Sequence, residues 1–330
     1  MIKEVQYGVI SDIHGSLENL ERSLRAFKEK GIEKIILNGD LAEVGKSLDE
    51  SQRNIAEVLE RVGKSGLEAY VQPAGHDMML AFESVMEKLG GECDNLINVN
   101  KPQKVEADGH DLVFLPGADF GPSTGSYKLG DDARMPSGNY LMSQEGITPF
   151  GKLEEYVVAL KEGKQVKGIN YTNINDLKRL VTNPDKTIVF CHVPRKFKGI
   201  ENCVDVTKFG EVTEDFLDEE NHLAKGTVIP LPHVERYKAA GVPVEVKTGN
   251  RGNEGLAKLY KELGIKKAIS GHFHGTGHRA TNANGEVVEE GKYTDELFWN
   301  SGCLSSGQTG ILTVRGKEVS YENVELEDYK

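Results

Sequence analysis

Aspartate and histidine side chains recur in this sequence directly after short apolar runs. They form five motifs: Ser11-Asp12-Ile13-His14-Gly15, Asn38-Gly39-Asp40, Gly75-His76-Asp77, Cys191-His192 and Ser270-Gly271-His272-Phe273-His274. Carboxylate and imidazole ligands together suit Mn, Fe, Co, Ni or Zn better than Ca or Mg. More than four candidate ligands are too many for one tetrahedral ion, and suit two ions about 3.5–4 Å apart that share a bridging carboxylate. The residue types therefore predict a centre of two divalent metal ions.

The apolar runs that precede these motifs predict buried strands. They cover Val5–Ile10, Lys34–Asn38, Glu68–Gln72, Thr187–Cys191 and Lys267–Ser270. Segments with apolar residues at helical spacing follow each of the first three strands, which gives the order βαβαβα. This order is typical of a mainly parallel, right-handed arrangement in an α/β protein. Because catalytic residues collect at the carboxyl ends of parallel strands, we expect the five motifs to meet in space.

Composition limits the classes of partner and compartment. The chain has 330 residues and a formal net charge of −12, which disfavours a nucleic-acid backbone or an anionic membrane as its main partner. Its four cysteines are far apart and form no C-x-x-C pair, so a thiolate zinc site is not expected and a reducing compartment is. No apolar run approaches the roughly 20 residues that span a bilayer, and no signal-like region opens the chain. We expect a cytoplasmic protein.

Two segments interrupt the strand and helix pattern. Residues from about 120 to 172 are rich in Gly, Ser and Pro, and residues from about 198 to 248 have an irregular hydrophobic pattern. We predict a single domain, residues 1–330, with insertions at these two places. The first insertion could serve as a lid, and both could form a homo-oligomer surface.

The ordered set of motifs resembles the calcineurin-like metallophosphoesterases. The resemblance covers about residues 5 to 119 and 174 to 314, and leaves out the two insertions. As a combined set these motifs are highly specific, although Gly39-Asp40 alone would carry almost no information. The resemblance implies an α/β fold, a metallophosphoesterase-like four-layer α/β/β/α sandwich with mixed sheets and inserted cap or loop segments.

The resemblance also implies a role for each motif position. The implied metal ligands are Asp12, His14 and His274 for the first ion, His192 and His272 for the second, and Asp40 as a bridge between the two. The histidine at position 76 would face the substrate, where it protonates or stabilises the leaving group. Asp77 would orient that histidine. His76 and Asp77 are therefore the predicted catalytic residues.

The chemistry that follows is hydrolysis of a phosphoric ester. Two dications lower the pKa of a bridging water, so that hydroxide exists near neutral pH and attacks phosphorus in line. They also stabilise the added negative charge of the transition state, while His76 supplies a proton to the departing alkoxide. A small phosphomonoester or phosphodiester is the favoured substrate. Two alternatives stay open: a nuclease of the same chemistry, and a scaffold protein with a degenerate second metal site.

One position departs from the family pattern. The family usually has Pro-Gly-Asn-His followed by Asp or Glu, where this chain has Pro73-Ala74-Gly75-His76-Asp77. Glycine at position 75 removes an oxygen ligand of the second metal, which a water, a backbone carbonyl or a substrate oxygen could replace. Asn38 lies about two residues, or ~6.5 Å, deeper along its strand and is a poor substitute. We therefore predict a weaker or differently populated second site.

Four residues are candidates for substrate binding. Arg195 follows His192 and could reach a phosphate, although a solvated basic loop is an equal alternative. Asn250 and Arg251 open the helix before the last motif, where free N–H groups and a guanidinium could bind an anion; an ordinary capped helix is the alternative. Arg134 belongs to the first insertion and is the fourth candidate.

Overall fold

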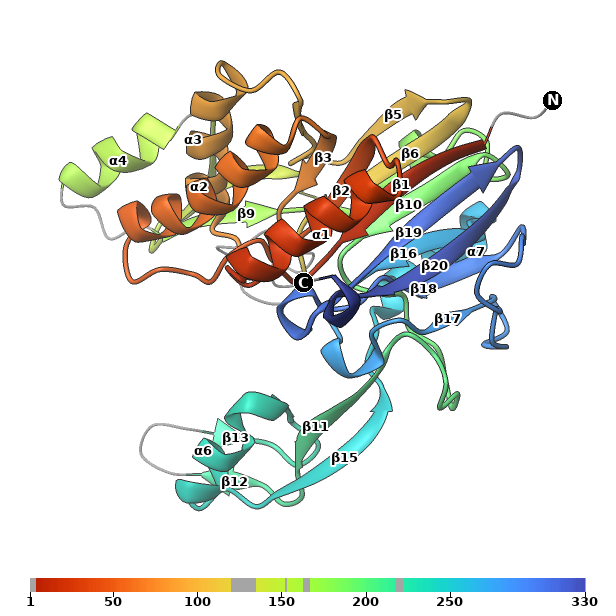
Figure 1. Ribbon diagram of the computed structural model, residues 1–330. Helices are drawn as coiled ribbons and strands as arrows, with labels where there is room; N and C mark the ends of the chain where they lie inside the picture. The colour runs from red at the N-terminus through yellow and green to blue at the C-terminus, as the bar shows by residue number, and fades with distance from the viewer. Residues whose placement is uncertain (1–3, 120–134, 152, 163–166, 218–221, 330) are drawn as a thin grey trace.

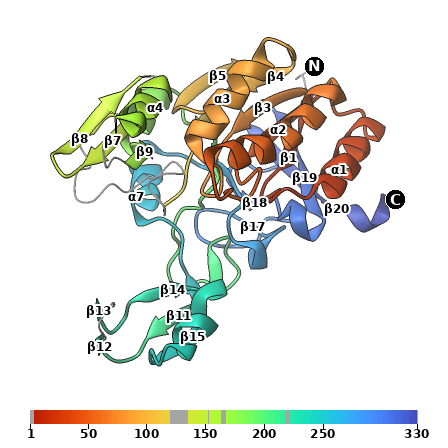
Figure 2. The ribbon, with the colours of Figure 1, turned by 90° about the vertical axis from the view of Figure 1, so that its left-hand side faces the viewer.

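A computed structural model describes residues 4–119, 135–151, 153–162, 167–217 and 222–329 (Figure 1). Two six-stranded sheets pack face to face, and helices cover the outer face of each (Figures 1 and 2). Each sheet contains both parallel and antiparallel pairs. The predicted four-layer α/β/β/α sandwich with mixed sheets is confirmed.

The first sheet contains the strands that precede three of the five motifs. Its order is β20 (Glu318–Glu325), β19 (Gln308–Arg315), β1 (Glu4–Ile10), β2 (Lys34–Asn38), β3 (Glu68–Gln72) and β4 (Leu96–Asn98). Strands β1 to β4 are parallel, whereas β19 and β20 are antiparallel to their neighbours. The outer face is covered by α1 (Leu17–Glu29), α2 (Leu48–Ser65) and α3 (Met79–Gly90). The helix α2 begins after Ser47, whose hydroxyl accepts from the Glu50 N–H, and ends at Gly66 in the left-handed conformation.

The second sheet carries the other two motifs. Its order is β17 (Ala280–Thr281), β18 (Leu297–Asn300), β16 (Lys267–Ser270), β10 (Thr187–Cys191), β6 (His110–Leu115) and β5 (Gln103–Ala107). Strands β6, β10, β16 and β18 are parallel, and the outer two are antiparallel. Helices α5 (Leu177–Leu180) and α7 (Glu254–Leu263) pack on the outer face. Asn253 caps α7, and its side-chain oxygen accepts from the Leu256 N–H at 2.9 Å.

Aromatic side chains fill the space between the sheets. The ring of Phe114 on β6 stacks on Phe190 of β10 at 5.4 Å and on Tyr70 of β3 at 5.7 Å. Trp299 of β18 is also completely buried in this layer. Burial of each such side chain contributes about 2 kcal/mol or more to stability. This layer fixes the two sheets against each other, and with them the loops at their carboxyl ends.

The two predicted insertions each contain a small antiparallel sheet. The first consists of β7 (Gly138–Ser143), β8 (Gly146–Phe150) and β9 (Lys167–Tyr171), with α4 (Leu153–Lys161) between the last two strands. The second pairs β11 (Val206–Val212) with β14 (Val228–Pro230) and β15 (Val244–Asn250), and carries β12 (Phe216–Leu217), β13 (His222–Leu223) and α6 (Val234–Ala239). This second segment projects from the sandwich (Figures 1 and 2).

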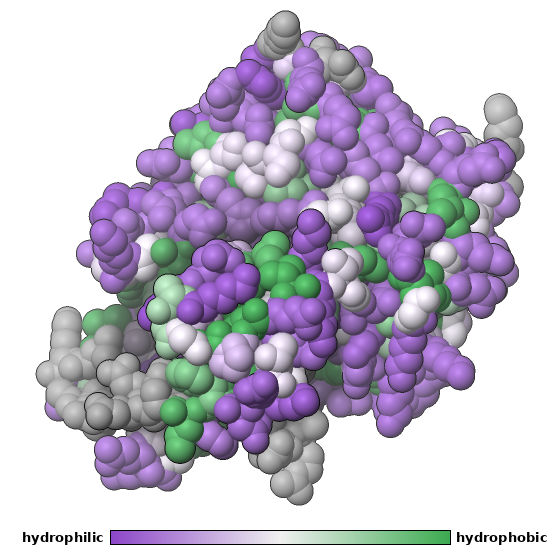
Figure 3. Space-filling view, turned by 90° about the horizontal axis from the view of Figure 1, so that it is seen from below, coloured by the Kyte–Doolittle hydropathy of each residue, from purple (hydrophilic) through white to green (hydrophobic). Residues whose placement is uncertain are grey.

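Short 3-10 turns complete the described elements: η2 (Ile174–Asp176), η3 (Leu231–His233), η4 (His274–Thr276), η5 (Leu304–Ser306) and η6 (Leu326–Asp328). The surface seen from below mixes hydrophobic and hydrophilic residues (Figure 3), and Leu217, Leu231 and Val246 of the projecting segment are exposed. Within the described part of the chain, every helix is too short or too polar to cross a bilayer.

Candidate metal centre

The six predicted metal ligands lie together, in loops at the carboxyl ends of four strands. The loops and their ligands are those after β1 (Asp12 and His14), β2 (Asp40), β10 (His192) and β16 (His272 and His274). Strands β1 and β2 belong to one sheet, and β10 and β16 to the other. The His272 N–H donates to Asp12 Oδ2 at 2.9 Å and so joins the two sheets at this edge. The motifs therefore meet as the strand order predicts.

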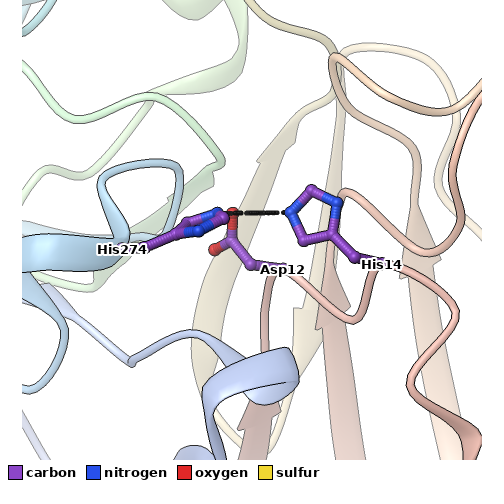
Figure 4. A group of neighbouring side chains, drawn as sticks. All are labelled: Asp12, His14 and His274. Atoms are coloured by element: carbon purple, nitrogen blue, oxygen red, sulfur yellow. Dashed lines mark hydrogen bonds and ion pairs between the residues drawn. The ribbon is translucent and has the colours of Figure 1, made fainter. Parts of the chain in front are cut away.

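The first group of ligands is Asp12, His14 and His274, drawn in Figure 4. The Nε2 atom of His274 lies 3.2 Å from Asp12 Oδ1 and 3.2 Å from Nε2 of His14. The remaining distance across the group, from His14 Nε2 to Asp12 Oδ1, is 3.8 Å. The carboxylate is buried, whereas the His274 side chain is 46% exposed. Three donor atoms thus converge on one point at the rim of the molecule.

The second group is Asp40, His192 and His272. His192 is completely buried, and its Nδ1–H donates to the Asn38 carbonyl oxygen at 2.8 Å. Its Nε2 lies 3.1 Å from Asp40 Oδ2 and 3.6 Å from Asp12 Oδ1. The His272 ring packs edge-on against it, with the centroids 5.4 Å apart. Asp40 also lies 3.9 Å from Nε2 of His14, so this carboxylate stands between the two groups.

The surroundings of one buried nitrogen, Nε2 of His192, show whether these residues suit a metal. Nε2 of His192 has no hydrogen-bond partner among the described residues. Because a carbonyl only accepts, the proton of the neutral ring sits on Nδ1, and the Nε2 lone pair faces two carboxylates. Such an arrangement is repulsive unless a cation or a second proton lies there. A backbone carbonyl behind a ligating histidine is also the usual way of fixing the metal-binding tautomer. The donor set fits divalent metal.

The backbone at the ligands is strained. Of the six non-glycine residues with positive φ in the described ranges, four belong to the cluster: Asp12, His14, Asp40 and His272, with φ between 47° and 69°. Each such conformation costs about 1–2 kcal/mol for a residue with a Cβ. The neighbouring Gly271 has no room for a side chain, since a Cβ there would lie 2.3 Å from Asp12 Oδ2. The fold therefore gives up stability to aim these side chains inward.

The carboxylates and imidazoles of the cluster shift the pKa values of one another. Burial alone would raise the pKa of Asp12 and of Asp40, but the imidazoles around them hold the pKa of both carboxyls below its usual range. Burial lowers the pKa of His192, yet the two carboxylates raise it to about 10. Burial and the neighbouring His192 lower the pKa of His272. The hydrogen bond to Asp12 likewise raises the pKa of His274 to about 10. Without a bound cation, His192 and His274 therefore carry positive charge, which a metal would replace with release of protons.

His76 lies at the edge of the cluster with a side chain 37% exposed. Its backbone N–H donates to Asp40 Oδ1 at 2.9 Å, and its ring meets that of His14 edge-on at 4.8 Å. Glu43 joins the two rings: Oε2 lies 3.0 Å from His76 Nδ1, and Oε1 lies 2.8 Å from His14 Nδ1. Sequence reasoning missed Glu43. Its one sequence signal is an acidic residue three positions after Asp40, in the same loop.

The predicted role of Asp77 requires a correction. Its carboxylate is completely buried and accepts from the backbone N–H groups of Leu41, Ala42 and Ala74. Burial and the charge of Asp40 raise the pKa of Asp77 to about 7, although these N–H groups oppose the shift. Asp77 therefore ties the loop after β3 to the loop after β2. The carboxylate that orients His76 is that of Glu43.

Comparison with protein families shows the family of the chain. The family described as calcineurin-like phosphoesterase matches residues 6–276, a span that contains all six ligands, Glu43 and His76. The chain belongs to the calcineurin-like phosphoesterase family. A comparison with curated proteins finds no match.

Solved structures resemble this phosphoesterase in fold at low sequence identity. One, with 10% identity, covers 98% of this chain and 100% of its own, with a TM-score of 0.53. TT1561 of Thermus thermophilus is 14% identical over 98% of this chain and 100% of its own, with a TM-score of 0.49. A dimetal phosphatase from Danio rerio is 13% identical over 99% of both chains, with a TM-score of 0.46. At 10% identity, the likeness with a TM-score of 0.53 concerns the fold alone.

Asn38 does not fill the position that Gly75 leaves empty in the phosphoesterase. Its side chain is completely buried, its Oδ1 accepts from Nε2 of Gln72, and its Nδ2 donates to the Ile269 carbonyl oxygen at 3.4 Å. The bond to Gln72 joins β2 to β3, and the bond to Ile269 links the two sheets beneath the cluster. Gly75 itself is buried in the loop after β3.

Arg195 makes contacts that differ from the predicted one. The Arg195 guanidinium lies over the rings of Phe197 and Phe298, at 4.1 and 4.4 Å, and donates to the Ala283 carbonyl oxygen at 2.7 Å. Cation–π contact and burial thus give this side chain a packing role on the outer side of the second sheet.

Asn250 is likewise engaged within its own segment. Its Nδ2 donates to Asp205 Oδ1 at 2.8 Å, and its Oδ1 accepts from the Ile200 N–H at 3.1 Å. Arg251 lies 4.9 Å from the Phe209 ring, and its substrate contact stays a prediction. Arg134 lies outside the described residues.

Proposed function

We propose that this phosphoesterase hydrolyses a small phosphomonoester or phosphodiester with two divalent ions bound at the Asp/His cluster. The observation that carries the proposal is the convergence of two ligand groups on buried carboxylates, with the unpartnered Nε2 of His192 between Asp12 and Asp40. The first ion would be held by Asp12, His14 and His274. The second would be held by His192 and His272, with Asp40 shared.

Bound divalent ions would supply Lewis-acid chemistry: they polarise a phosphoryl oxygen and lower the pKa of a water. The chain supplies the rest. The positive-φ backbone and the buried core hold the ligands in place before an ion arrives, so little reorganisation is needed on binding. The partly exposed rim at His274 and His76 leaves a path for a small substrate.

His76 is the proton donor of the proposed reaction. In the imidazolium form, Nδ1–H donates to Glu43 and so fixes the ring. The proton on Nε2 is then transferred to the leaving oxygen, and the ring is left as a neutral imidazole that keeps its Nδ1 proton. General acid catalysis of this kind contributes about 100- to 10,000-fold to the rate.

Turnover of p-nitrophenyl phosphate and of its bis-ester with Mn²⁺ tests the proposal. We expect hydrolysis that a chelator abolishes, and we expect His76→Gln to lose at least about 100-fold of the activity with unchanged metal content. His233→Gln is the matched control, because His233 is exposed on the projecting segment. A folded, metal-loaded chain that hydrolyses neither ester would refute the proposal. Salt-sensitive cleavage of DNA in place of both esters would favour a nuclease.

A further inference from the structure

The second ligand group lacks an oxygen donor from the loop after β3. Asp40, His192 and His272 offer three donor atoms within 4.8 Å of one another, and Asp40 is shared with the first group. Gly75 has no side chain to add. Ions of the Mn to Zn series take four or more ligands, so a further donor from the chain would complete this site.

The loop after β6 lies against the loop after β3. Strand β6 pairs in parallel with β10 from Asp111↔Thr187 to Leu115↔Cys191. The loop after β6 therefore begins at the sheet edge where His192 follows β10. The Gly117 N–H donates to the Pro73 carbonyl oxygen at 2.9 Å, and Gly117 has φ +102°. This turn brings Asp119 beside the loop that carries Gly75.

The Asp119 carboxylate faces the second ligand group. Its Oδ1 lies 4.0 Å from Nε2 of His272, and its side chain is 19% exposed. Two ligands that each lie about 2.1 Å from one ion can be at most about 4.2 Å apart. The separation therefore permits Asp119 and His272 to bind the same ion. Asp119 stands outside the group of donor atoms that lie within 4.8 Å of one another, so its carboxylate must turn toward Asp40 and His192 to share their ion. The negative charge of Asp119 also opposes the local excess of imidazoles.

We propose that Asp119 is an oxygen ligand of the second metal and compensates for the glycine at position 75. The inference rests on the proposed function, since it assigns one more ligand to the same centre. A carboxylate in place of an amide adds a negative charge to the second site, which strengthens the hold on a dication. The chain thus moves one metal ligand from the loop after β3 to the neighbouring loop after β6.

Metal binding tests this assignment without reliance on activity. Wild type, Asp119→Ala and Asp119→Asn are titrated with Mn²⁺ by calorimetry, and bound metal is counted after equilibrium dialysis. We expect two ions per wild-type chain. Asp119→Ala keeps the first ion at wild-type affinity and binds the second at least about 100-fold more weakly, because loss of a direct ligand costs at least as much as loss of an outer partner. Asp119→Asn falls between the two, because its amide oxygen can still ligate.

A rescue variant separates a ligand from a residue that merely orients His272. Gly75→Asn in the Asp119→Ala background supplies an amide oxygen from the other loop, and we expect it to recover at least 10-fold of the lost affinity for the second ion. An orienting role of Asp119 would not be rescued in this way. Asp295→Ala is the control: Asp295 is 67% exposed and pairs with Lys266 at 3.5 Å, and we expect no change in either site. Thermal unfolding of the metal-free variants checks that each one folds.

Several outcomes would overturn the assignment. The assignment is refuted if the Asp119→Ala variant binds two ions as tightly as wild type. It is also refuted if this variant binds both ions more weakly to the same degree. A wild-type chain that binds a single ion also refutes it, even if esters are hydrolysed. A wild-type chain that binds two ions, loses the second in Asp119→Ala and hydrolyses no ester would refute the proposed function and support the ligand.

Discussion

The two halves of the metal centre differ in depth and in their match to the family pattern. The first group ends in His274, with a side chain 46% exposed, and His14 is braced by Glu43 from the loop after β2. The second group is built on His192, which is completely buried and held by a backbone carbonyl from the sheet. Each half offers three donor atoms, with Asp40 shared between them. In the buried half, glycine stands at position 75, where the family pattern predicts an asparagine.

The two sites are therefore expected to differ in how tightly they bind an ion and in how accessible they are to substrate. A buried site gains strength from low dielectric surroundings, and each of its ligands is costly to remove. An exposed site is accessible to substrate and exchanges its ion more readily. Substitutions in one half, in both halves or in neither should separate the effects on ion binding from the effects on turnover.

The largest effect is expected from the shared carboxylate. Asp40→Asn removes the charge that lies 3.1 Å from His192 Nε2 and 3.9 Å from His14 Nε2. We expect both ions to bind more weakly and turnover to fall by at least about 1000-fold, as for loss of a major electrostatic contact. Metal content and kcat/KM measure this, with Asp295→Asn as control. Loss of only one ion would show that Asp40 does not join the halves.

A second test compares the two halves without metal. His192→Gln removes the completely buried imidazolium that lies 3.1 Å from Asp40 and 3.6 Å from Asp12, so we expect the free energy of unfolding to fall by about 3 kcal/mol. The same change at His274, which is half-exposed, should cost less than about 1 kcal/mol. Urea unfolding of the metal-free variants gives both values. Equal losses at the two positions would contradict the difference in depth.

Glu43 should affect the exposed half alone. Glu43→Gln weakens the support of His14 and His76, and we expect the first ion to bind about 10-fold more weakly, within the range for an outer partner, with a similar fall in kcat. The affinity for the second ion should not change. Calorimetric titration with Mn²⁺ resolves the two sites, and Glu57→Gln, on the exposed side of α2, is the control. If Asp77→Asn lowered kcat more than Glu43→Gln with no loss of stability, our correction of Asp77 would be wrong.

The smallest catalytic effect is expected at Arg195, which lies in neither half. Arg195→Met should leave KM within about 2-fold of wild type, because its guanidinium packs on Phe197 and Phe298. The free energy of unfolding should fall by about 1–2 kcal/mol, from the lost cation–π contacts and the bond to Ala283. Steady-state kinetics measures KM, and urea unfolding measures the free energy of unfolding. A 10-fold rise in KM would restore the predicted substrate contact.

The ligands could be predicted from sequence because their signal is local. A continuous apolar run such as Ile35-Ile36-Leu37 specifies a strand covered on both faces, and the Asp that follows it must lie at the strand end. Parallel order then brings these ends together. For this reason the strands before the motifs and the meeting of the six ligands follow from the chain alone.

The site residues that were not predicted correctly depend on contacts between loops. Such contacts leave no local signal in the sequence. Glu43 and Asp119 stand near the centre because two loops pack together, whereas Arg195 and Asn250 turn away from it for the same reason. In the second insertion, β15 alternates apolar and charged residues over Val244-Glu245-Val246-Lys247, a strand signal within the segment that we predicted to be irregular.

The most direct test of the account is a crystal structure of the Mn²⁺-soaked protein with anomalous scattering from the metal. We predict two peaks in each chain: one among Asp12, His14 and His274, the other beside His192 and His272, with Asp40 between them. A single peak, or peaks away from these residues, would contradict the proposal of a two-metal phosphoesterase centre.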